Sequence, residues 1–209
     1  MPAATLQTEA FVLARRPTAA DGWQALTLFA PEHGLVQGMQ RVLKKASASQ
    51  VLLDLFDEAA LSLESSNQGR TWFVREARVL SRHGGIGRSY EALEAASAFA
   101  ALIARNPVEA ESRPNVAVLL RTVFSALATA DSPAVVHFKS LYRFAREEGY
   151  PVKQQWLPSL PPELRARAET ILHTPLAEFD ARAVPKPECA AITRRLEAYL
   201  REYTEILLD

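Results

Sequence analysis

The spacing of apolar residues changes near residue 82 of this 209-residue chain, and no other feature constrains the fold as strongly. Before that point, apolar residues occur in five short runs that alternate with polar residues and are separated by turn-type stretches. The runs cover residues 6–16, 23–30, 34–43, 51–64 and 70–80. Such runs at a spacing of roughly 8–14 residues, with turn signals between them, predict a small antiparallel barrel or sandwich.

The individual runs indicate strands with different clarity. The sequence N-Q-G at residues 67–69, between the last two runs, is the clearest hairpin signal in the chain. The run 51–64 is ambiguous, because its alanine-rich part suits a helix as well as a strand. We expect a strand there and keep the helix as the alternative.

Beyond residue 82 the apolar residues follow a helical period. Ser89 stands where it would cap a helix that Pro107 ends, and Pro133 stands where it would open another helix in its first turn. Helices are expected over 89–106, from 115, and over 133–148, 163–173 and 188–207, the last with apolar residues stepping by four, three, four and three. The sequence therefore predicts an α+β protein with a β domain over 1–82 and an all-α domain over 83–209.

Composition narrows the class of protein. The 24 Lys and Arg residues balance 24 Asp and Glu residues, and 48% of the chain is hydrophobic, which is typical of a globular protein and excludes wholesale disorder. No apolar run approaches the roughly 20 residues that span a bilayer, and the N-terminus lacks the basic start of a signal peptide, so we expect a soluble, cytoplasmic protein. The single cysteine, Cys189, excludes an intramolecular disulfide and a zinc site of paired thiolates, and we expect no metal and no cofactor.

One short motif suggests an enzyme. Residues 82–87 read R-H-G-G-I-G, a pattern that resembles the acetyl-CoA pyrophosphate loop of GNAT-type acetyltransferases. Glycines there would expose backbone N–H groups to a phosphate at a helix N-terminus. An acetyltransferase needs strands on both sides of that helix, however, whereas only helical sequence follows here. A hinge between domains explains the glycines equally well, and we expect no enzymatic activity.

Basic residues form three local clusters although the net charge is zero. The first lies in the acid-free segment 38–50 and comprises Arg41, Lys44 and Lys45. The second lies within the last predicted strand and the hinge after it, and comprises Arg70, Arg75, Arg78, Arg82 and Arg88. The third forms one helical face, at intervals of four and three residues, and comprises Lys139, Arg143 and Arg146.

Aromatic residues accompany these cations. Trp72 and Phe73 lie within the second cluster, and Trp23 and Phe29 belong to the same predicted domain. Aromatic rings among arginines and lysines on a small barrel suit the stacking of bases together with phosphate contacts. Trp72 or Trp23 is the expected stacking residue.

Three stretches of the chain, in order, resemble the RecO family of recombination mediators. The first holds the family's opening strands and E-H-G turn, at residues 9–13, 26–29 and 31–35, followed by a basic segment at 38–45. The second is the strand at 70–80, and the third is the long helix at 137–151, which ends in G-Y-P where the family has G-Y-x-P. Many relatives carry a four-cysteine zinc module after that helix, and here K-Q-Q-W-L stands in its place.

The resemblance implies an N-terminal OB-fold followed by a helical partner-binding domain. It further implies a non-enzymatic, nucleoid-associated protein of recombinational DNA repair that binds and anneals single- and double-stranded DNA. The implied partners are RecR and the acidic, apolar C-terminal tail of single-stranded-DNA-binding protein.

These expectations assign residues. The residues expected to contact DNA are Arg41, Lys44, Lys45, Arg70, Trp72, Arg75, Arg78, Arg82 and Arg88. The residues expected to hold the tail are Phe138, Lys139, Tyr142, Arg143 and Arg146, although Phe138 and Tyr142 would equally suit a helical core. The alternative function is a protein–protein adaptor whose barrel binds a polypeptide and no nucleic acid.

Overall fold

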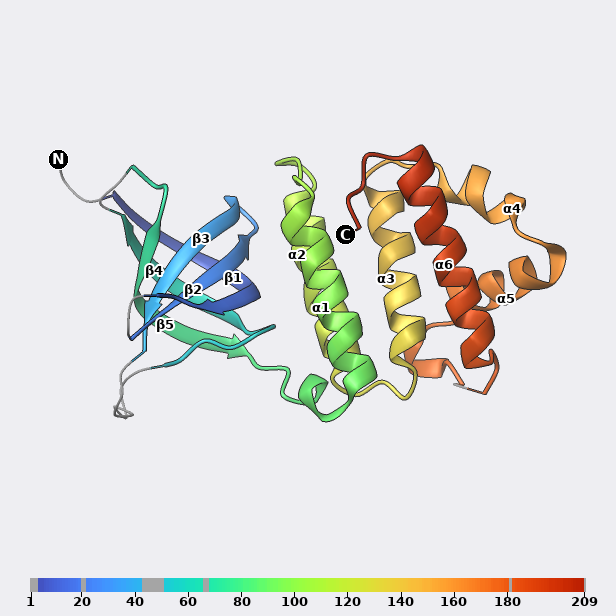
Figure 1. Ribbon diagram of the computed structural model, residues 1–209, viewed down its shortest axis with the longest axis horizontal. Coiled ribbons are helices and arrows are strands. Elements are labelled where there is room, and N and C mark those ends of the chain that lie inside the picture. The colour runs from blue at the N-terminus through green and yellow to red at the C-terminus, as the bar shows by residue number, and fades with distance from the viewer. Residues whose placement is uncertain (1–3, 20–21, 43–50, 66–67, 181, 209) are drawn as a thin grey trace. The chain divides into compact units, whose positions relative to one another are not determined.

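The computed structural model describes residues 4–19, 22–42, 51–65, 68–180 and 182–208 (Figure 1). The chain forms two compact units. Unit 1 comprises Met1–His83 and Pro107–Arg121, and unit 2 comprises Gly84–Asn106 and Thr122–Asp209. The first division lies one residue after the boundary expected from the sequence. The segment Pro107–Arg121, which we assigned to the helical domain, groups with the strands instead.

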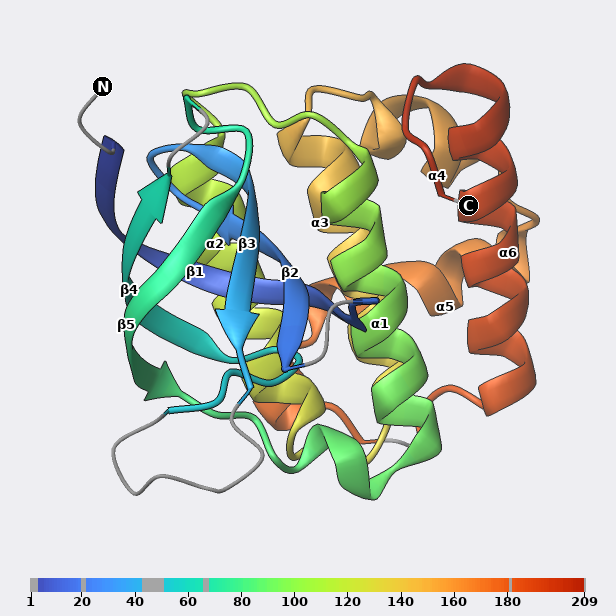
Figure 2. The ribbon, with the colours of Figure 1, turned by 60° about the vertical axis from the view of Figure 1, so that its left-hand side comes forward.

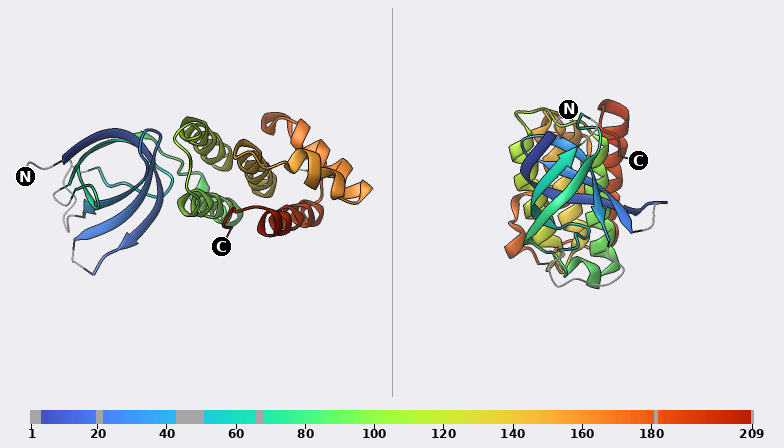
Figure 3. Two further views of the ribbon diagram at one scale, coloured as in Figure 1. Left: turned by 90° about the horizontal axis from the view of Figure 1, so that it is seen from above. Right: turned by 90° about the vertical axis from the view of Figure 1, so that its left-hand side faces the viewer.

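Unit 1 is built on a sheet that closes on itself. Within the described residues its strands are β1 (Ala4–Pro17), β2 (Trp23–Ala30), β3 (Gly34–Arg41), β4 (Glu58–Ser65) and β5 (Trp72–Ser81). Each strand pairs with two neighbours in the order β1-β2-β3-β5-β4, so the strands curve around a common interior (Figures 2 and 3). The pairs are antiparallel except for β3 and β5, which run parallel. The predicted α+β class is confirmed at this level.

Strand alternation fills the interior of the closed sheet. Along β2, Leu26 and Leu28 point inward and are fully buried, and on β3 Val36 points inward and is 6% exposed. Gly38 lies opposite Leu26 in the ladder, and a Cβ atom there would lie 3.1 Å from the Cδ1 atom of Leu28. A glycine therefore suits the crowded interior at this point.

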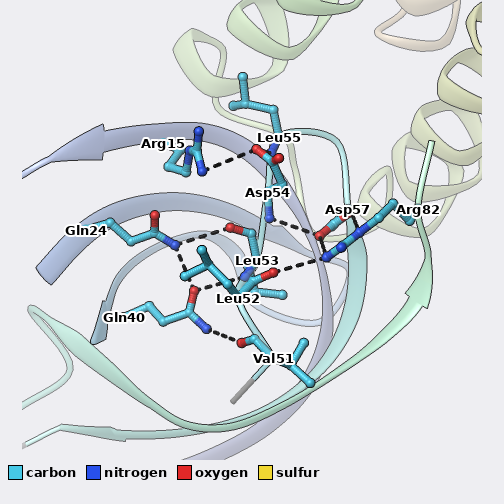
Figure 4. A network of polar contacts seen from close by, with 10 residues as sticks. All are labelled: Arg15, Gln24, Gln40, Val51, Leu52, Leu53, Asp54, Leu55, Asp57 and Arg82. Atoms are coloured by element: carbon cyan, nitrogen blue, oxygen red, sulfur yellow. Dashed lines mark hydrogen bonds and ion pairs between the residues drawn. The ribbon is translucent and has the colours of Figure 1, made fainter. Parts of the chain in front are cut away.

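The segment 51–57 is neither the strand nor the helix that the sequence suggested. It is an irregular stretch that inserts the fully buried Leu53 into the sheet interior, and β4 begins only at Glu58. Two buried side-chain amides hold it (Figure 4). Gln24 donates from Nε2 to the Leu53 carbonyl at 3.2 Å, and Gln40 donates from Nε2 to the Val51 carbonyl at 2.8 Å. These bonds replace the ladder or helix bonds that the backbone would otherwise need.

The remaining regular elements of the described chain are helices. The longer ones are α1 (Tyr90–Arg105), α2 (Arg113–Leu127), α3 (Pro133–Glu147), α5 (Pro162–His173) and α6 (Lys186–Tyr203). The short ones are η1 (Ile86–Arg88), the π-helical turn η2 (Val152–Trp156), α4 (Leu157–Ser159) and η3 (Leu176–Glu178). The predicted cap at Ser89 is confirmed, since its side chain accepts a hydrogen bond from the Ala92 N–H. The predicted start at Asn115 is wrong, because α2 begins at Arg113 and carries Pro114 in its first turn.

Unit 2 has its own core. Phe138, Tyr142 and Trp156 form an aromatic group with ring centroids 5.9–6.4 Å apart. On α6, Ile192 and Leu196 pack inward as the apolar period predicts, whereas Tyr203, which the same period includes, is 63% exposed. Among the described residues, no helix combines the length and apolar character needed to cross a membrane.

Candidate nucleic-acid interface

The outer surface of β2, β3 and β5 carries the chain's most suggestive group of side chains. Trp23 lies opposite Arg41 and Ala25 lies opposite Met39 in the β2–β3 ladder, and Met39 lies opposite Phe73 in the β3–β5 pair. Paired residues share a face of the sheet, and the interior is filled by their neighbours. We call these five residues the aromatic face.

The two rings of the aromatic face contact each other. Their centroids lie 5.6 Å apart with the planes at 79°, an edge-to-face pair. Trp23, Met39 and Phe73 are half-buried, so part of each remains open to solvent, and Arg41 is exposed. Partly open rings beside a cation can accept the flat face of a base and an adjacent phosphate.

Two turns border the aromatic face. β2 begins directly after the β1–β2 turn, and β5 begins directly after the β4–β5 turn. The predicted hairpin is confirmed by the antiparallel pairing of β4 with β5. Asn67 lies outside the described residues, and Gln68 and Gly69 have φ values of +61° and +81°. A Cβ atom on Gly69 would also meet the Trp72 ring at 3.4 Å. Arg70 is exposed on this turn.

The ring partner of Trp23 is Phe73 and not Trp72. Trp72 is half-buried and packs against the interior of the closed sheet together with Val74. Phe73, its neighbour, takes the outward position. Phe73 is absent from the residues predicted to contact DNA, although strict alternation from the inward Val74 would have placed it on the outer surface.

Two of the cations expected to hold phosphates, Arg75 and Arg82, have acidic partners. The Nε atom of Arg75 lies 2.5 Å from Oε2 of Glu64. Arg82 donates to both oxygens of the fully buried Asp57, at 3.0 and 2.8 Å, and to the Leu52 carbonyl (Figure 4). The hydrogen bond to Asp57 raises the pKa of Arg82. Arg82 therefore holds the segment before β4 in place.

Two arginines that were not predicted to contact DNA also pair with acids that are distant in sequence. Arg15 lies 3.4 Å from Asp54, and Arg121 of α2 donates to both carboxylate oxygens of the buried Glu58. The guanidinium of Arg121 also lies 5.6 Å from the centre of the Phe11 ring. Acids and arginines that are distant in sequence thus meet in space.

The remaining predicted DNA contacts are dispersed. Arg78 is exposed on β5, five residues beyond Phe73, and Arg88 is exposed in unit 2. Lys44 and Lys45 lie outside the described residues. The structure therefore brings Arg41 and Arg75 to the aromatic face and places Arg70 on the adjoining turn.

The predicted partner site on α3 coincides with the core of unit 2. Phe138 is fully buried and Tyr142 is 6% exposed. Lys139 donates from Nζ to the carbonyls of Ile171 and Thr174 at 2.9 and 2.5 Å, at the end of α5, and burial lowers its pKa.

The two arginines of that predicted site differ. Arg143 pairs with Glu147 at 2.7 Å, one turn along the helix, whereas Arg146 is exposed. The apolar stripe that we expected to receive a tail is thus part of the core, and Arg146 is the member open to solvent.

The glycines at 84–87 have a packing explanation. A Cβ atom on Gly85 would lie 2.1 Å from the Ala128 carbonyl oxygen, so only glycine fits there. All strands of the described chain precede this segment, and α1 is followed by further helices. The strand that would flank an acetyl-CoA loop on its far side is missing from the described residues.

Neither the cysteine nor the acids suggest other chemistry. Cys189 is buried, and burial raises the pKa of its thiol. No group of three or more His, Cys, Asp or Glu side chains in the described part of the chain could hold a metal ion.

Comparisons with protein-family models and with curated proteins find no match for this chain.

Proposed function

We propose that the protein is a non-enzymatic mediator of recombinational DNA repair, similar to the RecO family, that binds single-stranded DNA on the aromatic face. The observation that carries the proposal is the Trp23–Phe73 pair beside Arg41 on the outer surface of β2 and β3. We interpret the closed five-stranded sheet as an OB-fold. In that fold the surface of strands 2 and 3, with the turns between strands 1 and 2 and between strands 4 and 5, binds oligonucleotides.

Stacking would carry much of the binding energy. The rings of Trp23 and Phe73 and the apolar Met39 offer contacts to bases, whereas Arg75 is engaged by Glu64. Bases of a duplex are stacked on each other and closed to such contacts, which favours single strands. A net charge of zero fits a surface that relies on bases more than on phosphates.

The proposed partners rest on the family resemblance. We retain the tail of single-stranded-DNA-binding protein and RecR as proposed partners, with DNA annealing as the shared activity. Because Phe138 and Tyr142 belong to the core, a tail-binding surface on α3 would use exposed cations such as Arg146.

A binding titration tests the proposal. We expect labelled oligothymidylate to bind the protein at low salt, and Phe73→Ala to weaken this binding by about tenfold or more, because each stacked base contributes on the order of 1–3 kcal/mol. Tyr203→Ala is the matched control, since it removes an aromatic ring that is 63% exposed on α6. Fluorescence anisotropy measures the affinity, and circular dichroism checks the fold of each variant.

Two results would contradict the proposal. Equal affinities for wild type and Phe73→Ala would move the site away from the aromatic face. Absence of oligonucleotide binding at low salt, together with binding of a labelled acidic tail peptide, would favour the adaptor function. If binding is present, mixing complementary labelled strands with the protein should accelerate their pairing.

A further inference from the structure

Glu64 borders the aromatic face. In the β4–β5 ladder it lies directly opposite Phe73, whose other neighbour is Met39 of β3. Its side chain is 33% exposed, so the carboxylate is accessible to whatever lies on the Phe73 ring. The negative charge of Glu64 therefore lies beside the surface on which we propose that the DNA backbone binds.

A β-bulge supplies the partner of Glu64. Ser62 lies opposite Glu76 and Leu63 lies opposite Val74, so Arg75 is an extra residue of β5 that has no residue opposite it on β4. Bulges redirect the side chain of the extra residue. The Arg75 side chain is 60% exposed, and its Nε atom lies 2.5 Å from Oε2 of Glu64.

We propose that Glu64 is a built-in competitor for DNA phosphate: it occupies Arg75 and so limits the affinity of the aromatic face for the nucleic-acid backbone. This inference rests on the proposed function. A phosphate that approached Arg75 would have to displace the carboxylate and would also be repelled by its charge. An exposed ion pair of this kind is weak enough for such an exchange.

Competition by Glu64 would affect the selectivity of the aromatic face between single-stranded and duplex DNA. A single strand can gain affinity from stacking on Trp23 and Phe73 even while Arg75 is occupied. A duplex offers mainly its backbone, and binding that depends on backbone contacts loses most when a cation is withheld. Glu64 thus raises the preference of the aromatic face for unpaired strands over duplex DNA.

The test compares three variants with wild type by anisotropy titration over a series of salt concentrations. In Glu64→Gln, we expect single-strand affinity at low salt to rise about threefold to tenfold. The log–log salt slope should steepen by about 0.7 for single strands and about 0.9 for duplex, the value of one added phosphate contact. Duplex affinity should rise by the larger factor. In Arg75→Gln the affinity should fall, because the Glu64 carboxylate loses its partner and still repels phosphate. Glu64→Gln combined with Arg75→Gln should bind no more tightly than wild type.

A matched control separates competition from general charge. Glu76→Gln removes the same charge from an exposed position on the neighbouring strand. An equal gain in Glu76→Gln, or a gain that survives Arg75→Gln, would overturn the inference. If Glu64→Gln lowers the thermal unfolding midpoint, Glu64→Ser replaces it in the same comparison.

Failure of the inference can be told from failure of the proposed function. If wild type binds and Phe73→Ala does not, but Glu64→Gln leaves affinity and salt slope unchanged, then Glu64 is no competitor and the aromatic face stands. If neither wild type nor Glu64→Gln binds any oligonucleotide, the proposed function fails and the inference fails with it.

Discussion

Strand β5 and helix α3 contain similar residue types but present them differently. Both carry aromatic residues among basic ones: Trp72 and Phe73 in β5, and Phe138, Tyr142 and Phe144 in α3. In β5 the aromatics are adjacent, and the two-residue period of a strand sends Trp72 inward and Phe73 outward. In α3, Phe138 and Tyr142 are four residues apart and fall on one side, and both are buried, as is Phe144. The secondary structure, and not the composition, decides whether an aromatic–basic segment can serve as a binding surface.

The largest expected effect is on the free energy of unfolding, when a buried aromatic side chain of α3 is truncated. Phe138→Ala should lower the free energy of unfolding by about 3–5 kcal/mol, because it empties a fully buried aromatic position. Phe73→Ala, in a half-buried position, should cost about 1–2 kcal/mol at most. Urea unfolding followed by circular dichroism measures both. A small cost for Phe138→Ala would break the comparison and restore this ring as a partner contact.

The next effect separates structural from ligand-binding arginines. Arg82→Ala should lower the free energy of unfolding by about 1–3 kcal/mol, because it leaves the buried Asp57 carboxylate without its charge partner. Its oligonucleotide salt slope should match that of wild type. Arg78→Ala, an exposed position on the same strand, is the control and should leave stability within about 0.5 kcal/mol. A flatter salt slope in Arg82→Ala would show that this residue holds a phosphate.

A third variant tests the inward ring of β5. Trp72→Phe removes the indole but keeps an aromatic ring against the sheet interior, so oligonucleotide affinity should change less than twofold, whereas Phe73→Ala should lose about tenfold. In Trp72→Phe the intrinsic fluorescence comes only from Trp23 and Trp156, so the contribution of Trp23 is easier to follow. Quenching of that signal by oligothymidylate is the expected result. A large loss of affinity in Trp72→Phe would return the stacking role to Trp72.

The smallest effect concerns the buried cation of α3. Burial lowers the pKa of Lys139 from its ordinary value of 10.5, so folding disfavours its charged form. Between the folded and the unfolded pKa values the unfolded chain binds more protons, and stability therefore rises as the pH rises through that interval. As the pH is raised toward 10.5, the thermal unfolding midpoint of wild type should rise relative to that of Lys139→Met. A difference that does not vary with pH would place the ammonium in water.

Local sequence predicted much of the fold. The periods of 2 and 3.6 located the strands and helices, and Ser89, Pro133 and the turn residues Gln68 and Gly69 marked ends correctly. The irregular segment 51–57 was missed, because its conformation depends on Gln24 and Gln40 from strands earlier in the chain. No local pattern records such distant bonds.

The candidate site was less predictable than the fold. Arg75 and Arg82 looked uncompensated, since their acidic partners lie 11 and 25 residues away in sequence. Antiparallel pairing of β4 with β5 and the irregular segment before β4 bring them together. The bulge at Arg75 also shifts the alternation of β5, so a simple pattern cannot place every outward residue.

The amide pair inside the closed sheet has a consequence for the order of folding. Gln24 and Gln40 lie opposite each other, and Gln24 donates to Gln40 at 2.8 Å, so both are in place only when β2 and β3 have paired. The Leu53 N–H donates to the same Gln40 oxygen, at 3.1 Å. The β2–β3 hairpin is a short-range structure that forms at low entropic cost, whereas Leu53 docks across a longer loop. We infer that the hairpin forms first and that the segment 51–57 docks onto it late in the formation of unit 1.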